Sequence, residues 1–350
     1  MEQIRLALVG PGLIGRVHSQ LIQKNQSCHL QAVVAPDETC HREYVKTLPA
    51  PCSYYHSLQS CLNMEAIDGV IIASPNPFHA DQAMECIQAG VPVLIEKPIT
   101  DNLEDGYRVV EFAKEKNAKV MVGHHRAHSP ILRRARQVIT EGRLGQLVSI
   151  TGSAQFFKPT DYFDAGPWRK ERGGGPILIN LIHEVGNFRS LCGEIVAVQA
   201  ISSSRVRKFL VEDTVGINFL FENGVIGNFL LSDTAATGKS WEQTTGENPI
   251  FSHYNNEDCY NVTGTLGSLS IPTMRLRYFA KGVVPSWLNE LSEDKLEVEQ
   301  QNPLECQLEH FLDVISGKAV PLVSAADGFR NLQIVEAISQ STRTNQLVEV

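Results

Sequence analysis

The chain has 350 residues, with 39 acidic and 31 basic side chains and a formal net charge of −8 at pH 7. At about 150 residues per domain, this length predicts two domains. The acidic balance argues against a nucleic-acid partner, and no apolar run reaches the roughly 20 residues that span a bilayer. The first residues enter a predicted strand directly, without room for a signal peptide. We therefore expect a soluble, cytoplasmic protein with no membrane partner.

In chain order, the first 125 residues alternate between apolar runs of strand length and amphipathic stretches of helical length. The runs are rich in Val and Ile and do not alternate with polar residues, which is typical of strands buried on both faces of a parallel sheet. Strands are predicted at 4–9, 30–35, 69–73, 91–96 and 119–122, with helices at 81–89 and 103–116. This pattern predicts an α/β doubly wound Rossmann domain over residues 1–125.

In the second half, residues 126–350, the regular alternation of strands and helices ends. Short strands dominate it, and we predict an α+β domain with a mostly antiparallel open sheet. The predicted strands are 146–157, 195–203, 214–221, 225–232, 260–266 and 269–271, with hairpin turns at 222–224 and 266–268. A helix is expected from the glycines at 173–175 to about 191, and two more at 303–316 and 325–341, which are able to pack back on the first domain.

A glycine-rich turn follows the first strand and opens a predicted helix. Its sequence is Gly10-Pro11-Gly12-Leu13-Ile14-Gly15. In a βαβ unit this spacing is typical of dinucleotide binding, because the glycines allow a tight turn, close backbone approach to a pyrophosphate and close helix packing. The helix N–H groups then face the anion. The alternative is a glycine-rich turn without a ligand.

The residue that would contact the cofactor ribose is less clear. The expected acidic position at the end of the second strand is Ala35, and Asp37 follows two residues later. Asp37 could bond a ribose hydroxyl and favour NAD, whereas Arg42, beside His41, could take up the 2′-phosphate of NADP. The sequence slightly favours NADP. The alternative is that Asp37 and Arg42 begin a surface helix.

Two later turns also lie at the carboxyl ends of predicted strands, where open α/β sheets form their ligand crevice. One is the segment 73–79 and the other is Glu96-Lys97-Pro98. The cofactor-contacting candidates in these turns are Ser74, Pro75, Asn76, His79, Glu96 and Lys97. A further candidate, Arg126, follows the strand at 119–122.

With these motifs in order, nearly the whole chain resembles the glucose–fructose oxidoreductase and inositol dehydrogenase (Gfo/Idh/MocA) family. The matching segments are the glycine turn 10–15, the turn 73–79, Glu96-Lys97-Pro98, Val122-Gly123-His124-His125-Arg126, Gly142-Arg143-Leu144-Gly145, and Gly173-Gly174-Gly175 leading to His183. The resemblance implies NAD(P)-linked hydride transfer at a secondary alcohol or ketone of a carbohydrate-like small molecule, a sugar or cyclitol. It also implies homodimers or homotetramers assembled through the open sheet of the second domain.

The resemblance places Lys97 and His183 at the family's catalytic positions. Removing hydride from a carbinol carbon needs a base for the hydroxyl proton, and a histidine suits that task near neutral pH. Lys97 would hydrogen-bond the same oxygen and stabilise its developing charge. From the residues alone, two other interpretations are equally possible. Lys97 would then be a solvated surface group, and His183 would be a residue of the core.

The chain departs from the family around His183. Many members carry an aspartate four residues before this histidine, where this chain has Ile179, and another acid three residues after it, where this chain has Gly186. Asn180 lies one helical turn before His183 and on the same predicted face. We expect Asn180 to replace the aspartate as a substrate hydrogen-bonding group. An amide takes no proton, so more of the chemistry would fall on His183 and Lys97.

Further substrate-binding candidates lie in loops of aromatic, basic and polar residues. They are Lys158, Tyr162, Trp168 and Arg169 in the loop before His183, and Trp241 in a predicted polar loop at 240–249. Such side chains suit stacking on a sugar and bonding to a hydroxyl or carboxylate. Trp168 and Trp241 are equally interpreted as small satellite cores or oligomer contacts.

A metal site is not expected. The eight cysteines include no Cys-x-x-Cys pair. His124, His125 and His128 are close in sequence, but they straddle a strand end rather than one helix face.

Two alternatives to a sugar or cyclitol enzyme remain open. One is a dihydrodiol or cyclic semialdehyde dehydrogenase of the same family. The other is a nucleotide-binding regulatory protein with weakened chemistry, which the fold alone does not exclude.

Overall fold

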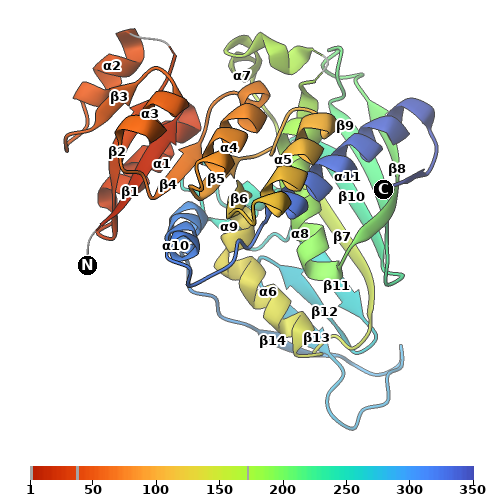
Figure 1. The fold of residues 1–350 in the computed structure, drawn as a ribbon. Coiled ribbons are helices and arrows are strands. Elements are labelled where there is room, and N and C mark those ends of the chain that lie inside the picture. The colour runs from red at the N-terminus through yellow and green to blue at the C-terminus, as the bar shows by residue number, and fades with distance from the viewer. Residues whose placement is uncertain (1–2, 37–38, 172) are drawn as a thin grey trace. The chain divides into compact units, whose positions relative to one another are not determined.

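The computed structural model describes residues 3–36, 39–171 and 173–350, and it divides into two compact units. Unit 1 comprises the chain up to His128 together with Pro303–Leu332, and unit 2 comprises Ser129–Asn302 together with Gln333–Val350. The long helix α11 (Ala325–Thr344) therefore begins in unit 1 and ends in unit 2 (Figure 1). The functional division into a cofactor half at 1–125 and a substrate half at 126–350 stays a prediction.

Unit 1 is built on a sheet of six parallel strands in the order β3-β2-β1-β4-β5-β6. The strands are β1 (Ile4–Val9), β2 (Cys28–Val34), β3 (Ser53–Tyr55), β4 (Gly69–Ile72), β5 (Val93–Glu96) and β6 (Val120–Gly123). The strand order reverses direction between β1 and β4, which is where open α/β sheets bind ligands. The predicted doubly wound parallel sheet is confirmed.

Helices cover both faces of this sheet (Figure 1). On one face pack α3 (Leu58–Met64), α4 (His79–Gln88) and α5 (Leu103–Glu115). On the other pack α1 (Leu13–Lys24) and α10 (Pro303–Ile315). The remaining short helices are α2 (Thr39–Lys46), η1 (Asn76–Phe78) and η2 (His125–His128). Because both faces are covered, β4, β5 and β6 are buried throughout, as their unbroken apolar runs predicted.

Unit 2 is built on a nine-stranded sheet in the order β14-β13-β12-β11-β7-β10-β9-β8-β15. Its strands are β7 (Leu147–Gln155), β8 (Ile195–Ser203), β9 (Thr214–Phe221), β10 (Ile226–Ser232), β11 (Tyr260–Gly264), β12 (Gly267–Ile271), β13 (Arg275–Tyr278), β14 (Ser292–Lys295) and β15 (Val348–Glu349). Among the described strands of this second sheet, only β7 and β10 pair in parallel. The predicted, mostly antiparallel sheet is confirmed.

One face of the unit 2 sheet packs against helices α6 (Pro130–Thr140), α8 (Ile182–Cys192) and the end of α11. Strands β9 and β10 alternate between buried and exposed residues, because their other face carries no helix among the described residues. The buried face holds an aromatic cluster in which Phe188 of α8 lies 5.4–5.5 Å, between ring centres, from Phe219, Phe229 and Tyr260.

Three expected segments differ from the sequence prediction. The polar segment 240–249 contains the short helix α9 (Trp241–Thr245), because the Ser240 side chain accepts a hydrogen bond from the Gln243 backbone N–H and caps it. The turn between β11 and β12 falls at 265–266 rather than 266–268. The helix predicted from 173 begins with a π-helical turn, η4 (Ile177–Leu181).

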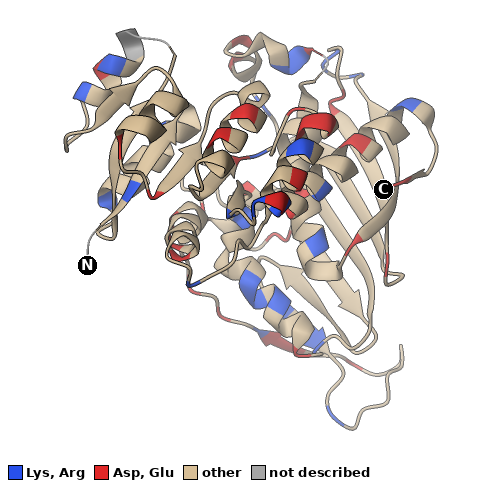
Figure 2. Cartoon of the chain, viewed as in Figure 1, with Lys and Arg blue, Asp and Glu red and all other residues tan. Residues whose placement is uncertain are grey.

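Charged side chains lie on the helices of both units. Figure 2 shows acidic residues on α4 and α5 of unit 1 and basic residues on α6 of unit 2. None of the helices in the described part of the chain combines the length and the apolar character that a membrane span requires.

We expect Phe188→Ala to lower the free energy of unfolding by about 3–5 kcal/mol, because it leaves a cavity in the aromatic cluster of unit 2. Urea denaturation of the full chain measures the change, with the exposed Leu288→Ala as the control. Equal stabilities for the two variants would contradict the assignment of Phe188 to the core.

Candidate active site

The glycine turn of unit 1 is shaped by close backbone contacts. Gly10 has a φ of +82°, and a Cβ on it would lie 2.6 Å from the backbone of Ser74. A Cβ on Gly15 would lie 2.1 Å from the Gly10 carbonyl oxygen. A Cβ on Gly12, at the start of α1, would meet no described atom within 4 Å. The backbone therefore packs closely against Gly10 and Gly15, whereas the space beside Gly12 at the N-terminus of α1 is open. An open helix N-terminus suits a pyrophosphate.

The turn after β4 is tied to the turn after β5 by one buried imidazole. His79 is 1% exposed, and its two ring nitrogens each lie 2.9 Å from a backbone carbonyl oxygen, of Pro98 and of Ser74. The Ser74 hydroxyl donates to Gln82 at 2.6 Å. Pro75 and Asn76 lie between them, at the start of η1. The structure thus brings Gly10, Ser74, His79 and Pro98 together within unit 1.

A buried contact between a carboxylate and an imidazole lies beside Lys97. The Glu96 carboxylate is 2.7 Å from Nε2 of His18 on α1, and it also accepts a hydrogen bond from the Lys97 backbone N–H at 3.2 Å. Burial raises the pKa of Glu96, but the hydrogen bond and charge of His18, with His125 and Lys97, outweigh burial and lower it. The carboxylate is therefore charged, and it links α1 to the Lys97 turn.

The ribose-recognition candidates lie near the ends of β2 and β3. Ala35 is buried, and its carbonyl oxygen accepts a hydrogen bond from the Tyr54 hydroxyl at 2.9 Å. Arg42 on α2 is exposed, with its guanidinium 3.0 Å from Nε2 of His56 and over the ring of Tyr54 at 5.7 Å. Asp37 lies outside the described residues. Leu13 is exposed and Ile14 half-buried at the start of α1.

His124, His125 and His128 follow β6, just before and within the short helix η2. Within the residues that the structure describes, no three His, Cys, Asp or Glu side chains are grouped to hold an ion. Arg126 is 3% exposed on η2, which packs against α10. His128 lies against the ring of His310 at 5.1 Å between ring centres, and His124 Nε2 is 3.4 Å from the Asn331 amide.

In unit 2, His183 and Asn180 lie on either side of the junction between η4 and α8. His183 is 6% exposed in the first turn of α8, and Asn180 is half-buried in the π-helical turn before it. Glu212 accepts a hydrogen bond from the Ile177 backbone N–H at 2.9 Å, at the start of that turn. Single π-helical turns inside helices occur frequently at functional sites.

The Lys158 ammonium meets Asn180 directly. Lys158 is 9% exposed, and its Nζ donates to Oδ1 of Asn180 at 2.7 Å. The carboxylate of Asp233 lies 3.8 Å from the same nitrogen. Burial lowers the pKa of Lys158 to about 8, because the acidic neighbours, chiefly Asp233, offset only part of the cost of burying the charge.

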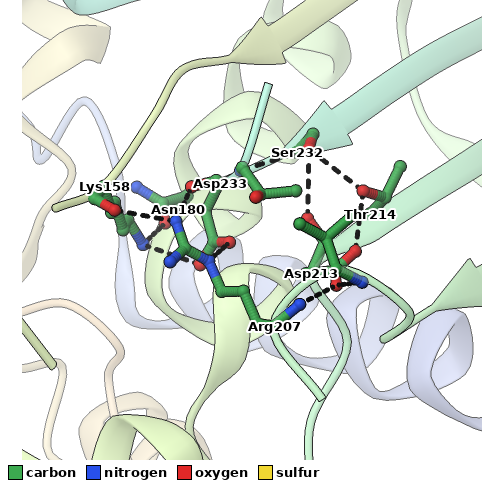
Figure 3. A network of polar contacts seen from close by, with 9 residues as sticks. Lys158, Asn180, Arg207, Asp213, Thr214, Ser232 and Asp233 are labelled. Carbon is green, nitrogen blue, oxygen red and sulfur yellow. Dashed lines mark hydrogen bonds and ion pairs between the residues drawn. The ribbon is translucent and has the colours of Figure 1, made fainter. Parts of the chain in front are cut away.

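Asp233 belongs to a buried polar network between the loop at 204–213 and the end of β10 (Figure 3). Arg207 donates to the Asp233 carboxylate at 2.7 Å and to the Lys158 carbonyl oxygen at 2.8 Å. Asp213 accepts hydrogen bonds from the Val206 and Arg207 backbone N–H groups at 2.9 and 3.0 Å. Burial raises the pKa of Asp233, against the opposing effects of Arg207 and Lys158. The network holds Lys158 in place through its backbone.

The aromatic candidates divide into two residues that lie beside cations, Tyr162 and Trp168, and one core residue, Trp241. The Tyr162 ring carries Lys158 Nζ at 5.0 Å and the Arg169 guanidinium at 4.0 Å from its centre. Trp168 is 54% exposed, beside Arg169. Trp241, by contrast, is 2% exposed, packs on Tyr260 and donates to Glu247 at 2.9 Å. Its burial favours the core-packing interpretation over a substrate contact.

Two protein-family models match most of the chain. Residues 4–124 match the model described as oxidoreductase family, NAD-binding Rossmann fold. Residues 136–350 match the oxidoreductase family, C-terminal alpha/beta domain, of the same Gfo/Idh/MocA group. The chain belongs to the Gfo/Idh/MocA oxidoreductase family. The resemblance drawn from the motifs is confirmed, and the protein is an oxidoreductase by family.

Individual relatives in the Gfo/Idh/MocA family are distant. A 1,5-anhydro-D-fructose reductase from Ensifer adhaerens is 28% identical over 296 residues, 84% of this chain and 83% of that protein. An inositol 2-dehydrogenase from Rhizobium meliloti is 23% identical over 349 residues, 99% of both chains. The solved WlbA dehydrogenase from Bordetella pertussis, in complex with NADH and UDP-GlcNAcA, has a TM-score of 0.77 at 23% identity, covering 100% of this chain and 99% of that one.

Sequence reasoning missed the residues that hold the Lys97 turn and Lys158 in place. His18 lies three residues after the glycine turn but 78 residues from Glu96, and Arg207 and Asp233 lie in segments without a motif. A polar side chain in the apolar stripe of α1 was the available signal for His18. Lys97 lies in unit 1 and His183 in unit 2, so their joint action stays a prediction.

We expect Glu96→Gln to destabilise unit 1 by about 3–5 kcal/mol at pH 7, because it leaves His18 without its buried anion. The pKa of Glu96 is lowered in the fold, so the pair stabilises fully above the ordinary carboxyl pKa of about 4.3. That contribution is lost as the pH falls through the lower folded pKa. Thermal unfolding from pH 7 to 3 measures it, with the exposed Glu111→Gln as the control. A pH-independent difference between Glu96→Gln and wild type would contradict the charged pair.

Proposed function

We propose that this protein is an NAD(P)-dependent oxidoreductase acting on a secondary alcohol or ketone of a sugar or cyclitol. The observation that carries the proposal is the packing of unit 1 around the glycine turn. That turn leaves the N-terminus of α1 open, and the Lys97 turn is tied to the same helix through Glu96 and His18. The names of the reductase and inositol dehydrogenase relatives support this substrate class.

The nicotinamide cofactor, when bound, takes up or supplies the hydride at the carbinol carbon. Gly10, Gly12 and Gly15 would hold its pyrophosphate, with Ser74, Asn76 and His79 shaping the neighbouring wall. His183 takes the hydroxyl proton when the alcohol is oxidised and returns it when the ketone is reduced. Lys97 donates a hydrogen bond to the same oxygen and stabilises its negative charge. Asn180, Lys158 and Tyr162 bind other polar groups of the substrate.

NADP is the preferred cofactor in this proposal. Arg42 presents an exposed guanidinium beside His56, and Ala35 offers no carboxylate to a ribose hydroxyl. A 2′-phosphate would therefore meet positive charge rather than repulsion from this part of the described chain.

We also propose that the protein forms a homo-oligomer through the helix-free face of the unit 2 sheet. That face exposes Leu220, Ile226 and Leu230 on adjoining strands. The cytoplasmic location stays a prediction from the sequence.

We expect Arg42→Ala to weaken NADPH binding about tenfold and to leave NADH binding unchanged, because one charge-assisted contact to a phosphate is lost. Fluorescence titration with both nucleotides measures the two dissociation constants. The exposed Lys46→Ala on the same helix is the control for a general loss of positive charge. An equal loss of affinity for both nucleotides would show that Arg42 does not select the 2′-phosphate.

We expect Lys97→Ala to lower kcat by at least about 100-fold while nucleotide binding remains measurable, because the variant loses the charge that stabilises the reacting oxygen. Absorbance at 340 nm, over sugars, cyclitols and their keto forms, measures turnover. Nucleotide titration of the same variant shows that the cofactor site is intact. Retained turnover would remove Lys97 from the chemistry, and failure of the wild type to bind either nucleotide would overturn the proposed function.

A further inference from the structure

The hydrogen bond between Lys158 and Asn180 uses the one acceptor oxygen of the Asn180 side chain. The N–H groups of both side chains stay available to a ligand. An ammonium group has three N–H donors and no acceptor. In the described chain, one acceptor, Oδ1 of Asn180, lies within hydrogen-bond distance of Lys158 Nζ. That oxygen is the acceptor group of the amide, so the Asn180 side chain offers a ligand its NH₂ group, for which no described residue is an acceptor. The pair therefore presents N–H groups only.

Surrounding side chains and backbone hold Lys158 and Asn180 in position. The Lys158 side chain lies among the rings of Phe156 and Tyr162, and its backbone is held by Arg207. Asn180 lies in the π-helical turn that leads into His183. Asp233 is 2% exposed, and its Oδ1 accepts a hydrogen bond from Arg207. Its Oδ2 forms an ion pair with Lys158 Nζ at 3.8 Å, which is too long for a hydrogen bond, so the ammonium keeps N–H donors without an acceptor among the described residues.

We propose that Lys158 and Asn180 bind a carboxylate of the substrate, which makes that substrate a sugar acid or a carboxylated cyclitol rather than a neutral polyol. The inference rests on the proposed function, since it assigns the substrate class of the same site. Binding of the carboxylate requires no metal ion or other additional group.

The donor-only character favours a carboxylate over a hydroxyl. A hydroxyl bound there accepts with a single oxygen and needs an acceptor elsewhere for its own O–H proton, whereas a carboxylate accepts at both oxygens and has no proton to place. Hydrogen bonds between charged partners are also roughly twice as strong as neutral ones. Arg169 adds a second cation at Tyr162, and its buried Nε has no acceptor among the described residues.

The local charge favours a carboxylate over a phosphate monoester. Several charged groups act on the Lys158 ammonium, namely Asp233, Glu242, Arg207, Arg169 and Glu212. The three acids balance Lys158 and the two arginines in number, and burial is the largest cause that lowers the pKa of Lys158 to about 8. A monoanion in contact with the ammonium replaces the lost solvation, whereas a dianion brings a second charge that Asp233 and Glu242 repel.

The test compares matched ligands on the full chain loaded with the nucleotide that it binds. Isothermal titration calorimetry measures D-glucuronate against D-glucose, D-galacturonate against D-galactose, and D-glucose 6-phosphate as the phosphate arm. We expect each uronate to bind about 10- to 100-fold more tightly than its neutral sugar, from one charge-assisted contact in a buried site.

Two variants and one control locate the effect. Lys158→Met removes the charge at similar length, and Asn180→Asp replaces the donor with a carboxylate while still accepting from Lys158. Both should abolish the preference for the acid and leave nucleotide affinity unchanged. Lys239→Met, at a half-exposed lysine paired with Glu257 at 3.7 Å, should retain it.

The pH dependence distinguishes ligand binding from a structural role. Binding an anion raises the pKa of Lys158, so uronate affinity should be full below pH 8 and fall as the pH rises above it. Lys158→Met should remove that dependence. A merely structural lysine would instead change the stability of unit 2 and leave the ratio of acid to neutral affinity unmoved.

The inference is overturned if the uronates bind no more tightly than the neutral sugars, which includes the case in which neither binds. It is also overturned if glucose 6-phosphate binds more tightly than both uronates. Turnover of neutral sugars with unaltered kinetics in Lys158→Met also overturns it while the proposed oxidoreductase stands. Absence of nucleotide binding by the wild type would instead remove the proposed function.

Discussion

The burial of one carboxylate, Glu96, constrains the arrangement of unit 1. An ionised carboxylate removed from water is costly unless a cation and hydrogen bonds replace the solvent. Glu96 meets this requirement with His18 on one side and the Lys97 backbone N–H on the other. The helix that begins at the glycine turn and the turn that carries Lys97 therefore cannot shift independently. One buried contact thus couples the position of the proposed cofactor turn to that of Lys97.

Unit 2 buries a charge of the opposite sign, the Lys158 ammonium. Its buried cation, Lys158, has Asp233 within reach, yet Arg207 takes the closest contact with that carboxylate. The lysine is left with a neutral amide as its hydrogen-bond acceptor and with aromatic faces around it. A buried charge that is only partly compensated costs stability. Such a group is retained at functional sites more often than in structural cores, and its compensation then comes from a ligand.

The local features of both units were predictable from sequence, and the long-range ones were not. The glycine turn and Glu96-Lys97-Pro98 are continuous motifs, so their position at strand ends followed from the apolar runs that precede them. Lys158 and Asn180 were each expected near the substrate, but their mutual contact depends on a π-helical turn, which no periodicity of the chain reveals. His18 was missed because its partner lies 78 residues away. Trp241 was expected in a polar loop and is buried because Ser240 caps a short helix there.

The departure of this chain from the family around His183 then acquires a physical meaning. An aspartate four residues before the histidine offers a substrate two acceptor oxygens and a negative charge. Ile179 offers neither, and Asn180 uses its single acceptor oxygen on Lys158. The hydrogen-bonding polarity of this wall is thereby reversed, from accepting a substrate hydroxyl to donating to a substrate oxygen. A site that keeps the same hydride chemistry can change its substrate class by this reversal alone, because an unmatched buried donor costs about as much free energy as a good contact contributes. The overall charge of −8 strengthens the point. A chain with this net charge does not attract anions through its long-range field. Under the proposed function, nucleotide and substrate anions are therefore bound through a few local N–H donors rather than through the overall field.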